Sequence, residues 1–301
     1  MRSFFRIIVN DLHHFHARMS GPPKSNVPAH NPSSLNPLNP PHLNRLPHAS
    51  SIEAIRLTIK VQDPTDREVP AILHRAKPSA GGPRRNVGAI LVSGAGGGVS
   101  GPNGIYPSLA TKLATHHIPT LRLDYRAPSR TPQCTNDILA GMDWMEREEG
   151  VEGVVLVGWS FGSAPTIGVG ARERRDGAKG RVRGVANVAP QTAETSGIHD
   201  LAPTPVLFLH GTGDACLSPR CSQNLYASYG EYGSREIELY EGDNHGLTNS
   251  SAKAERRLFE FITRCLGVSA EEETAQAKLA DGEEGVQMMK EGHDLEHGER
   301  L

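Results

Sequence analysis

Two kinds of segment alternate along the middle of the chain, short apolar runs and longer amphipathic stretches. This alternation is typical of strands joined by crossover helices. Strands are predicted at 52–62, 69–77, 87–95, 119–125, 153–159, 181–190, 205–211 and 235–242, and helices at 107–117, 136–149, from Phe161 onward, at 219–230 and at 253–267. The order predicts an α/β fold with one mostly parallel sheet of about eight strands and helices on both faces.

The two ends of the chain lack this pattern. Pro, Asn and Ser crowd residues 21–50, so 1–50 is predicted to be a disordered leader, rich also in His. Residues 268–301 are acidic and poor in aromatics, which predicts a disordered or partly helical tail. The folded domain is therefore expected at 51–267. Arginines between apolar residues near the start loosely fit an organelle presequence, so we expect a cytoplasmic protein with mitochondrial import as the alternative.

Composition excludes several classes of function. A formal net charge of -2 over 301 residues argues against nucleic-acid binding. No apolar run approaches the roughly 20 residues that span a bilayer, so no stable membrane insertion is expected. The four cysteines fall outside metal-ligand spacings and are interpreted as reduced thiols. We expect neither a metal nor an organic cofactor.

The run of valines at 154–157 stops at a GxSxG pentapeptide, Gly158–Gly162, with Ser160 at its centre. A phosphate-binding loop would need a lysine after the glycines, and none follows. Two interpretations remain: a plain buried turn, and a sharp strand-to-helix bend that presents Ser160 as a nucleophile. The strand before the pentapeptide and the small residues after it fit the bend.

A serine nucleophile requires an oxyanion hole. One donor is the backbone N–H after the serine, here that of Phe161, and the other comes from the loop after the third strand. The glycine-rich stretch 93–98 occupies that loop, which assigns the second donor to the Ala95 N–H. A flexible glycine-rich turn is the alternative.

A nucleophile also requires an acid and a histidine, in that order along the chain. Asp214 follows the strand at 205–211, and His245 follows the strand at 235–242. Because the carboxyl ends of parallel strands meet at one edge of a sheet, these side chains can converge there with Ser160. Asp243 and Asp200 are the rival acids, and Asp243 is better suited to capping its turn. His210 precedes the acid and is interpreted as a support for the loop.

With these motifs the chain resembles the α/β-hydrolase superfamily over residues 52–267. The resemblance rests on SGAGGG, LRLDYR, GWSFG, HGTGDACLSP and GDNHGL, each at the end of a predicted strand. It implies Ser160 as nucleophile, Asp214 as acid and His245 as base, and the small dienelactone-hydrolase-like or serine-esterase branches as relatives. The chain departs from many members at Ser93, where they carry histidine. The short connection 190–205 leaves minimal or no room for a cap domain.

The implied activity is that of a serine-dependent carboxylic ester hydrolase acting on a small ester, thioester or related acyl substrate through an acyl-enzyme, with a peptidase or dienelactone hydrolase as variants. Arg126, just past the fourth strand, is a candidate for binding a substrate carboxylate, with a solvated ion pair or a structural hydrogen bond as the alternative. The alternative function is a catalytically inactive scaffold that keeps the fold and binds a partner.

Overall fold

One eight-stranded sheet forms the centre of the described part of the protein. The computed structural model describes residues 51–63, 67–80, 82, 85–175 and 178–268. In chain order the strands are β1 (Ile52–Lys60), β2 (Glu68–Ala76), β3 (Val87–Val92), β4 (Thr120–Leu123), β5 (Gly153–Trp159), β6 (Val182–Val188), β7 (Val206–Gly211) and β8 (Arg235–Tyr240). They lie in the order β1-β2-β4-β3-β5-β6-β7-β8. β2 is antiparallel to β1 and β4, and all other pairs are parallel. The predicted mostly parallel sheet is confirmed.

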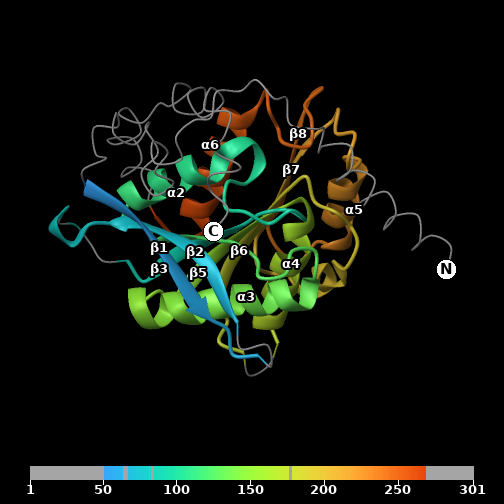
Figure 1. Ribbon diagram of the computed structural model, residues 1–301. Coiled ribbons are helices and arrows are strands. Elements are labelled where there is room, and N and C mark those ends of the chain that lie inside the picture. Colours follow the sequence, from blue (N-terminus) through green and yellow to red (C-terminus); the bar gives the residue numbers. More distant parts are fainter. Residues whose placement is uncertain (1–50, 64–66, 81, 83–84, 176–177, 269–301) are drawn as a thin grey trace, which may run out of the picture. The chain divides into compact units, whose positions relative to one another are not determined.

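Helices cover both faces of this sheet (Figure 1). On one face lie α2 (Ile105–Thr115) and α6 (Ser251–Cys265), and on the other α3 (Thr131–Trp144), α4 (Ser163–Glu173) and α5 (Arg220–Ser228). Successive residues of β5 point to opposite faces: Leu156 packs into the core with α3 and α4, and Val155 and Val157 into the core with α2 and α6. Burial on both faces explains the uninterrupted apolar run of this strand.

Helix α3 differs most from its prediction. It begins at Thr131, five residues before the predicted start at 136, and Pro132 lies in its first turn. Proline suits that position because its missing N–H has no helical partner there and its φ is already helical. The helix then passes into a π-helical turn, Met145–Glu149, which ends at Gly150 in the left-handed conformation. The apolar pattern alone therefore placed the helix too late.

The connection between β6 and β7 is short. Residues 189–205 are all described and contain one 3-10 helix, η8 (Ser196–Asp200), so this connection holds no cap domain, as predicted. No helix in the described part of the chain is both long enough and apolar enough to cross a membrane. The predicted leader 1–50 and, apart from Val268, the predicted tail lie outside the described residues.

Candidate active site

Ser160 lies in a sharp bend between β5 and α4. The 3-10 turn η7 (Ser160–Gly162) joins the two elements, and Ser160 has a φ of 55°, a left-handed conformation that is uncommon for a residue with a side chain. The flanking glycines allow the bend to close. A Cβ on Gly158 would lie 2.5 Å from the Gly162 carbonyl oxygen, and one on Gly162 would lie 2.5 Å from the Ser93 carbonyl oxygen. Any side chain at either position would push strand, turn and helix apart.

The glycine-rich loop after β3 lies against this bend. A Cβ on Gly94 would lie 3.3 Å from the Ser160 Cβ, so the loop backbone is in contact with the serine. Gly97 N–H donates to the Gly94 carbonyl across 3.1 Å. Because C=O and N–H of a trans peptide point in opposite directions, this bond turns the Ala95 N–H away from the inside of the turn.

Two side chains from the loop after β4 fix the glycine-rich loop. Asp124 Oδ1 accepts a hydrogen bond from Gly98 N–H at 2.6 Å, and Ser129 Oγ donates to the Ala95 carbonyl at 3.0 Å. The Ala95 N–H itself donates no hydrogen bond within the described residues. Phe161 lies in the first turn of η7, where amides have no helical acceptor. Both amides are thus available to an external acceptor.

Asp214 and His245 form a hydrogen-bonded pair. They follow the neighbouring parallel strands β7 and β8, and His245 Nδ1 lies 2.7 Å from Asp214 Oδ2. The Asp214 side chain is fully buried, while that of His245 is 17% exposed. The two loops are held together by Gly213 N–H, which donates to the Asp243 carbonyl at 2.9 Å. The buried acid therefore contacts a histidine whose ring reaches the surface.

The Asp214 carboxylate is completely hydrogen-bonded. Its Oδ1 accepts the backbone N–H groups of Cys216 at 2.7 Å and Leu217 at 3.0 Å. Its Oδ2 contacts His210 Nε2 at 3.1 Å in addition to His245. Burial raises the pKa of Asp214, but the hydrogen bonds from His210, His245 and the backbone outweigh it and hold the pKa well below its usual value. Asp214 is therefore ionised at neutral pH.

Trp159 links the bend at Ser160 to His245, and Ser160 itself makes no direct hydrogen bond with that histidine in the described part of the chain. Within the described residues, no hydrogen bond joins Ser160 Oγ to the imidazole. Trp159, which precedes the serine, connects the two: its Nε1–H donates to the His245 carbonyl at 3.2 Å, and the two ring centroids are 5.6 Å apart. The structure thus brings the acid and the histidine into contact and connects the residue before the serine to the histidine.

The carboxylate of Asp243, one of the two rival acids, stabilises the loop that follows β8. Its buried carboxylate accepts the backbone N–H groups of Asn244 at 2.8 Å, Asn249 at 3.2 Å and Ser250 at 2.8 Å. These bonds close the loop that carries His245 onto the start of α6. The Asp243 carboxylate therefore bonds backbone N–H groups of the loop that carries His245, rather than the imidazole of His245.

Arg126 is enclosed by acids. Its guanidinium is bonded to Asp63 at 2.7 Å and, through Nε, to Asp137, and the side chains of all three residues are at least nine-tenths buried. These bonds connect the β1–β2 turn, the end of β4 and α3, and they raise the pKa of Arg126. Its donors face these two carboxylates, and a role of Arg126 in substrate binding stays a prediction.

Among the described residues, one group of side chains has the composition of a metal site. Asp214, Cys216 and His245 each offer a ligand atom, and these atoms lie within 4.8 Å of one another. A carboxylate has about four lone-pair positions, and four N–H donors already occupy those of Asp214. The group therefore fits a hydrogen-bond network better than a metal centre.

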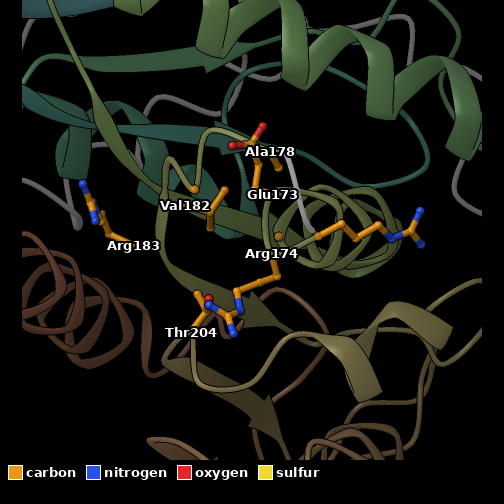
Figure 2. A pocket seen from close by; sticks show the side chains of 9 residues that line it. Glu173, Arg174, Ala178, Val182, Arg183 and Thr204 are labelled. Atoms are coloured by element: carbon orange, nitrogen blue, oxygen red, sulfur yellow. The ribbon is translucent and has the colours of Figure 1, made fainter.

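A hollow of about 320 Å³ lies at the opposite end of the strands, between the end of α4 and the start of β6. Figure 2 shows its lining, with the Arg174 side chain directed toward Thr204. Arginines at the last turn of a helix complement its dipole. The hollow contains no pairing of a nucleophile with a base among the described residues, so the catalytic candidates remain at the carboxyl edge.

Comparison with known proteins supports the fold. No protein-family model and no curated protein matches the sequence. Among solved structures, the chain is similar to Est1E from Butyrivibrio proteoclasticus (TM-score 0.57, 16% identity, covering 70% of this chain and 99% of that one). It is also similar to XC6422 from Xanthomonas campestris, an α/β serine hydrolase without lid (0.54, 15%, 70% and 94%). A cold-adapted esterase from an Arctic intertidal metagenomic library is a third (0.53, 18%, 70% and 94%).

The protein therefore has the α/β-hydrolase fold, and the resemblance predicted from its motifs is confirmed at this level. At identities of 15–18% a structural likeness establishes the fold, and the activity has to be argued from the site.

Proposed function

We propose that the protein is a serine hydrolase that cleaves a small ester, thioester or related acyl substrate through an acyl-enzyme on Ser160. The observation that carries the proposal is the Asp214–His245 hydrogen bond of 2.7 Å at the sheet edge where Ser160 is held at a φ of 55°. An ordinary buried turn requires neither the strained serine nor an ionised acid behind a partly exposed histidine.

The roles follow from the contacts. His245 Nε2 takes the Ser160 hydroxyl proton while Oγ attacks the substrate carbonyl carbon, and Nδ1–H stays bonded to Asp214. The proton then passes from His245 to the leaving group as the bond to that group breaks. A water molecule, deprotonated by His245, releases the acid and restores the serine.

Electrostatics support these roles. Because the pKa of Asp214 is lowered, its negative charge is present at neutral pH to stabilise the imidazolium that forms at His245. The Ala95 and Phe161 N–H groups stabilise the oxyanion, each contributing about 3 kcal/mol in well-studied enzymes.

The Ser160–His245 hydrogen bond forms in the substrate complex. Catalytic hydrogen bonds are often long in free enzymes and tighten when substrate binds. The backbone on both sides of Ser160 is held by close contacts at Gly158 and Gly162, so we expect its hydroxyl to move toward the imidazole by rotation about χ1.

The substrate class is argued from the surroundings of the serine. In the described part of the chain, the short β6–β7 connection adds no cap over the carboxyl edge of the sheet. Est1E has been solved with ferulic acid bound, and the Arctic protein is described as an esterase. The bound ferulic acid and the description as an esterase both favour a carboxylic ester over a peptide as the substrate of this protein.

A fluorophosphonate probe tests the proposal. The folded wild-type protein is expected to be labelled, and Ser160→Ala is expected to lose all labelling. Asp214→Asn should retain the fold and lower kcat by about 10⁴-fold, the loss seen when such an acid is replaced by its amide. A folded wild-type protein that takes up no label would instead support the inactive scaffold, and a labelled Ser160→Ala variant would show that the nucleophile lies elsewhere. A panel of p-nitrophenyl esters, acyl thioesters and amino-acid amides then identifies the acyl group.

A further inference from the structure

His210 is the second histidine of the site. It is the penultimate residue of β7, has no exposed surface and lies on the same side of the strand as Phe208, facing α5. Its Nδ1 lies 2.7 Å from Ser222 Oγ on α5, and its Nε2 lies 3.1 Å from Asp214 Oδ2 and 2.9 Å from the Leu217 carbonyl oxygen. Both ring nitrogens are therefore used.

The partners determine which nitrogen carries the proton. Nε2 faces a carboxylate oxygen and a carbonyl oxygen, which only accept hydrogen bonds, so Nε2 must be the N–H donor. The Ser222 hydroxyl can donate to Nδ1, which completes the neutral tautomer. Ser222 is itself fully buried, and this bond fixes the plane of the imidazole.

We propose that His210 is a positioning residue that directs the Asp214 carboxylate toward His245. This inference rests on the proposed function. Two backbone amides hold Oδ1, and His210 holds one side of Oδ2, which leaves the other side of Oδ2 for His245 Nδ1. Without His210, the protein loses the only described side chain besides His245 that bonds Oδ2, and the carboxylate can rotate away from the line to His245.

Three variants separate this role from packing. His210→Leu keeps apolar bulk and removes the donor, while His210→Gln places an amide N–H near the position of Nε2. His199→Leu makes the same change at an exposed histidine in η8 and is the matched control. Thermal melts and near-ultraviolet circular dichroism show which variants fold as wild type.

The expected kinetic result distinguishes a change in the orientation of the Asp214 carboxylate from a loss of packing. His210→Leu lowers kcat about tenfold or more with KM within about twofold, because the effect falls on the transition state. Its acidic limb in the pH profile of kcat/KM moves to lower pH, because a carboxylate that has rotated away stabilises the imidazolium of His245 less. His210→Gln recovers most of kcat and the wild-type limb, and His199→Leu matches wild type throughout.

A readout without substrate keeps the inference independent of the enzyme assignment. In histidine-labelled protein, NMR is expected to show the proton of His210 on Nε2 and a slowly exchanging His245 Nδ1–H. That His245 signal persists in His210→Gln and is lost by exchange broadening in His210→Leu. Wild-type kcat and an unchanged His245 signal in His210→Leu would overturn the inference, as would equal losses in the Leu and Gln variants. If the wild type takes up no fluorophosphonate while the NMR result holds, the proposed function fails and the positioning contact stands.

Discussion

Trp159 donates its indole N–H to the backbone carbonyl of His245 across 3.2 Å, while its ring lies beside the imidazole. One residue before the proposed nucleophile is thereby joined to the proposed base, although 86 residues separate them along the chain. The bond joins the end of β5 to the loop after β8, so the position of His245 depends on the bend at Ser160.

This relationship predicts the effect of Trp159→Phe. The substitution keeps an aromatic ring beside His245 and removes the donor, so the histidine loop gains freedom. We expect kcat/KM to fall about fivefold, the equivalent of a hydrogen bond worth about 1 kcal/mol. Trp144→Phe in α3, away from the site, is the control and should retain wild-type kcat/KM. Equal activities in the two variants would show that the Trp159–His245 bond has no part in positioning the base.

Gly162 and Gly168 provide a matched pair of alanine substitutions. A Cβ on Gly162 would lie 2.5 Å from the Ser93 carbonyl oxygen, whereas one on Gly168, in the following helix α4, would meet nothing within 4 Å. Gly162→Ala should therefore lower the free energy of unfolding by about 1–3 kcal/mol and abolish fluorophosphonate labelling. Gly168→Ala should raise the free energy of unfolding by up to about 1 kcal/mol, because alanine favours the helix more than glycine does. Urea denaturation measures both, and a stable, labelled Gly162→Ala variant would contradict the close packing described at the bend.

Arg126→Met tests the buried ion pairs. The change leaves Asp63 and Asp137 buried without their cation, and burial already raises the pKa of Asp137. The expected loss of unfolding free energy is about 3–5 kcal/mol, the cost of breaking a buried pair from one side. Arg147→Met removes an exposed arginine paired with Glu148 and should cost less than about 1 kcal/mol. A small loss at Arg126 would indicate that the two acids can take up protons or move into solvent at little cost.

Glu255 predicts a stability change with pH. Burial raises its pKa to about 7, against the opposing effects of Ser108 and Lys112, and its Oε2 has no partner in the described part of the chain. Because the folded pKa lies above the unfolded one, the folded state loses stability as pH rises from about 4.5 to about 7 and stays lower above it. Glu255→Gln should therefore raise the free energy of unfolding at about pH 8 by about 1–3 kcal/mol. Denaturation curves at about pH 4 and pH 8 check this, since the gain should be confined to the higher pH.

Asp214 predicts the opposite pH dependence. Its pKa is lowered in the folded protein, so it adds stability above the unfolded pKa of about 3.9 and loses that contribution as pH falls through the folded value. Wild-type unfolding free energy should fall with acidification below about pH 4, and Asp214→Asn should lack this part of the fall. Urea titrations at a series of acidic pH values measure the difference. Parallel curves for the two proteins would mean that the carboxylate is not held in its ionised form.

Local pattern determined much of the fold and the order of the site. The apolar run of β5 followed by Gly158–Gly162 predicted a strand, a bend and a helix, because burial on both faces and the steric demand of the bend act over a few residues. The positions of Asp214 and His245 after β7 and β8 followed from the rule that parallel strands end at one edge. The start of α3 does not follow from its apolar repeat, because the Pro132 start signal lies outside that repeat.

Only the tertiary structure decided which polar groups meet. Arg126 lies 63 residues from one of its acids, and no spacing in the sequence indicates that the two pack together rather than facing a substrate. His210 is only four residues from Asp214, yet its function depends on Ser222 in α5 and on the Leu217 carbonyl, both of which the fold brings to its ring. Such contacts depend on how helices and loops pack on the finished sheet, and the energy of that packing is shared among residues distant in the chain.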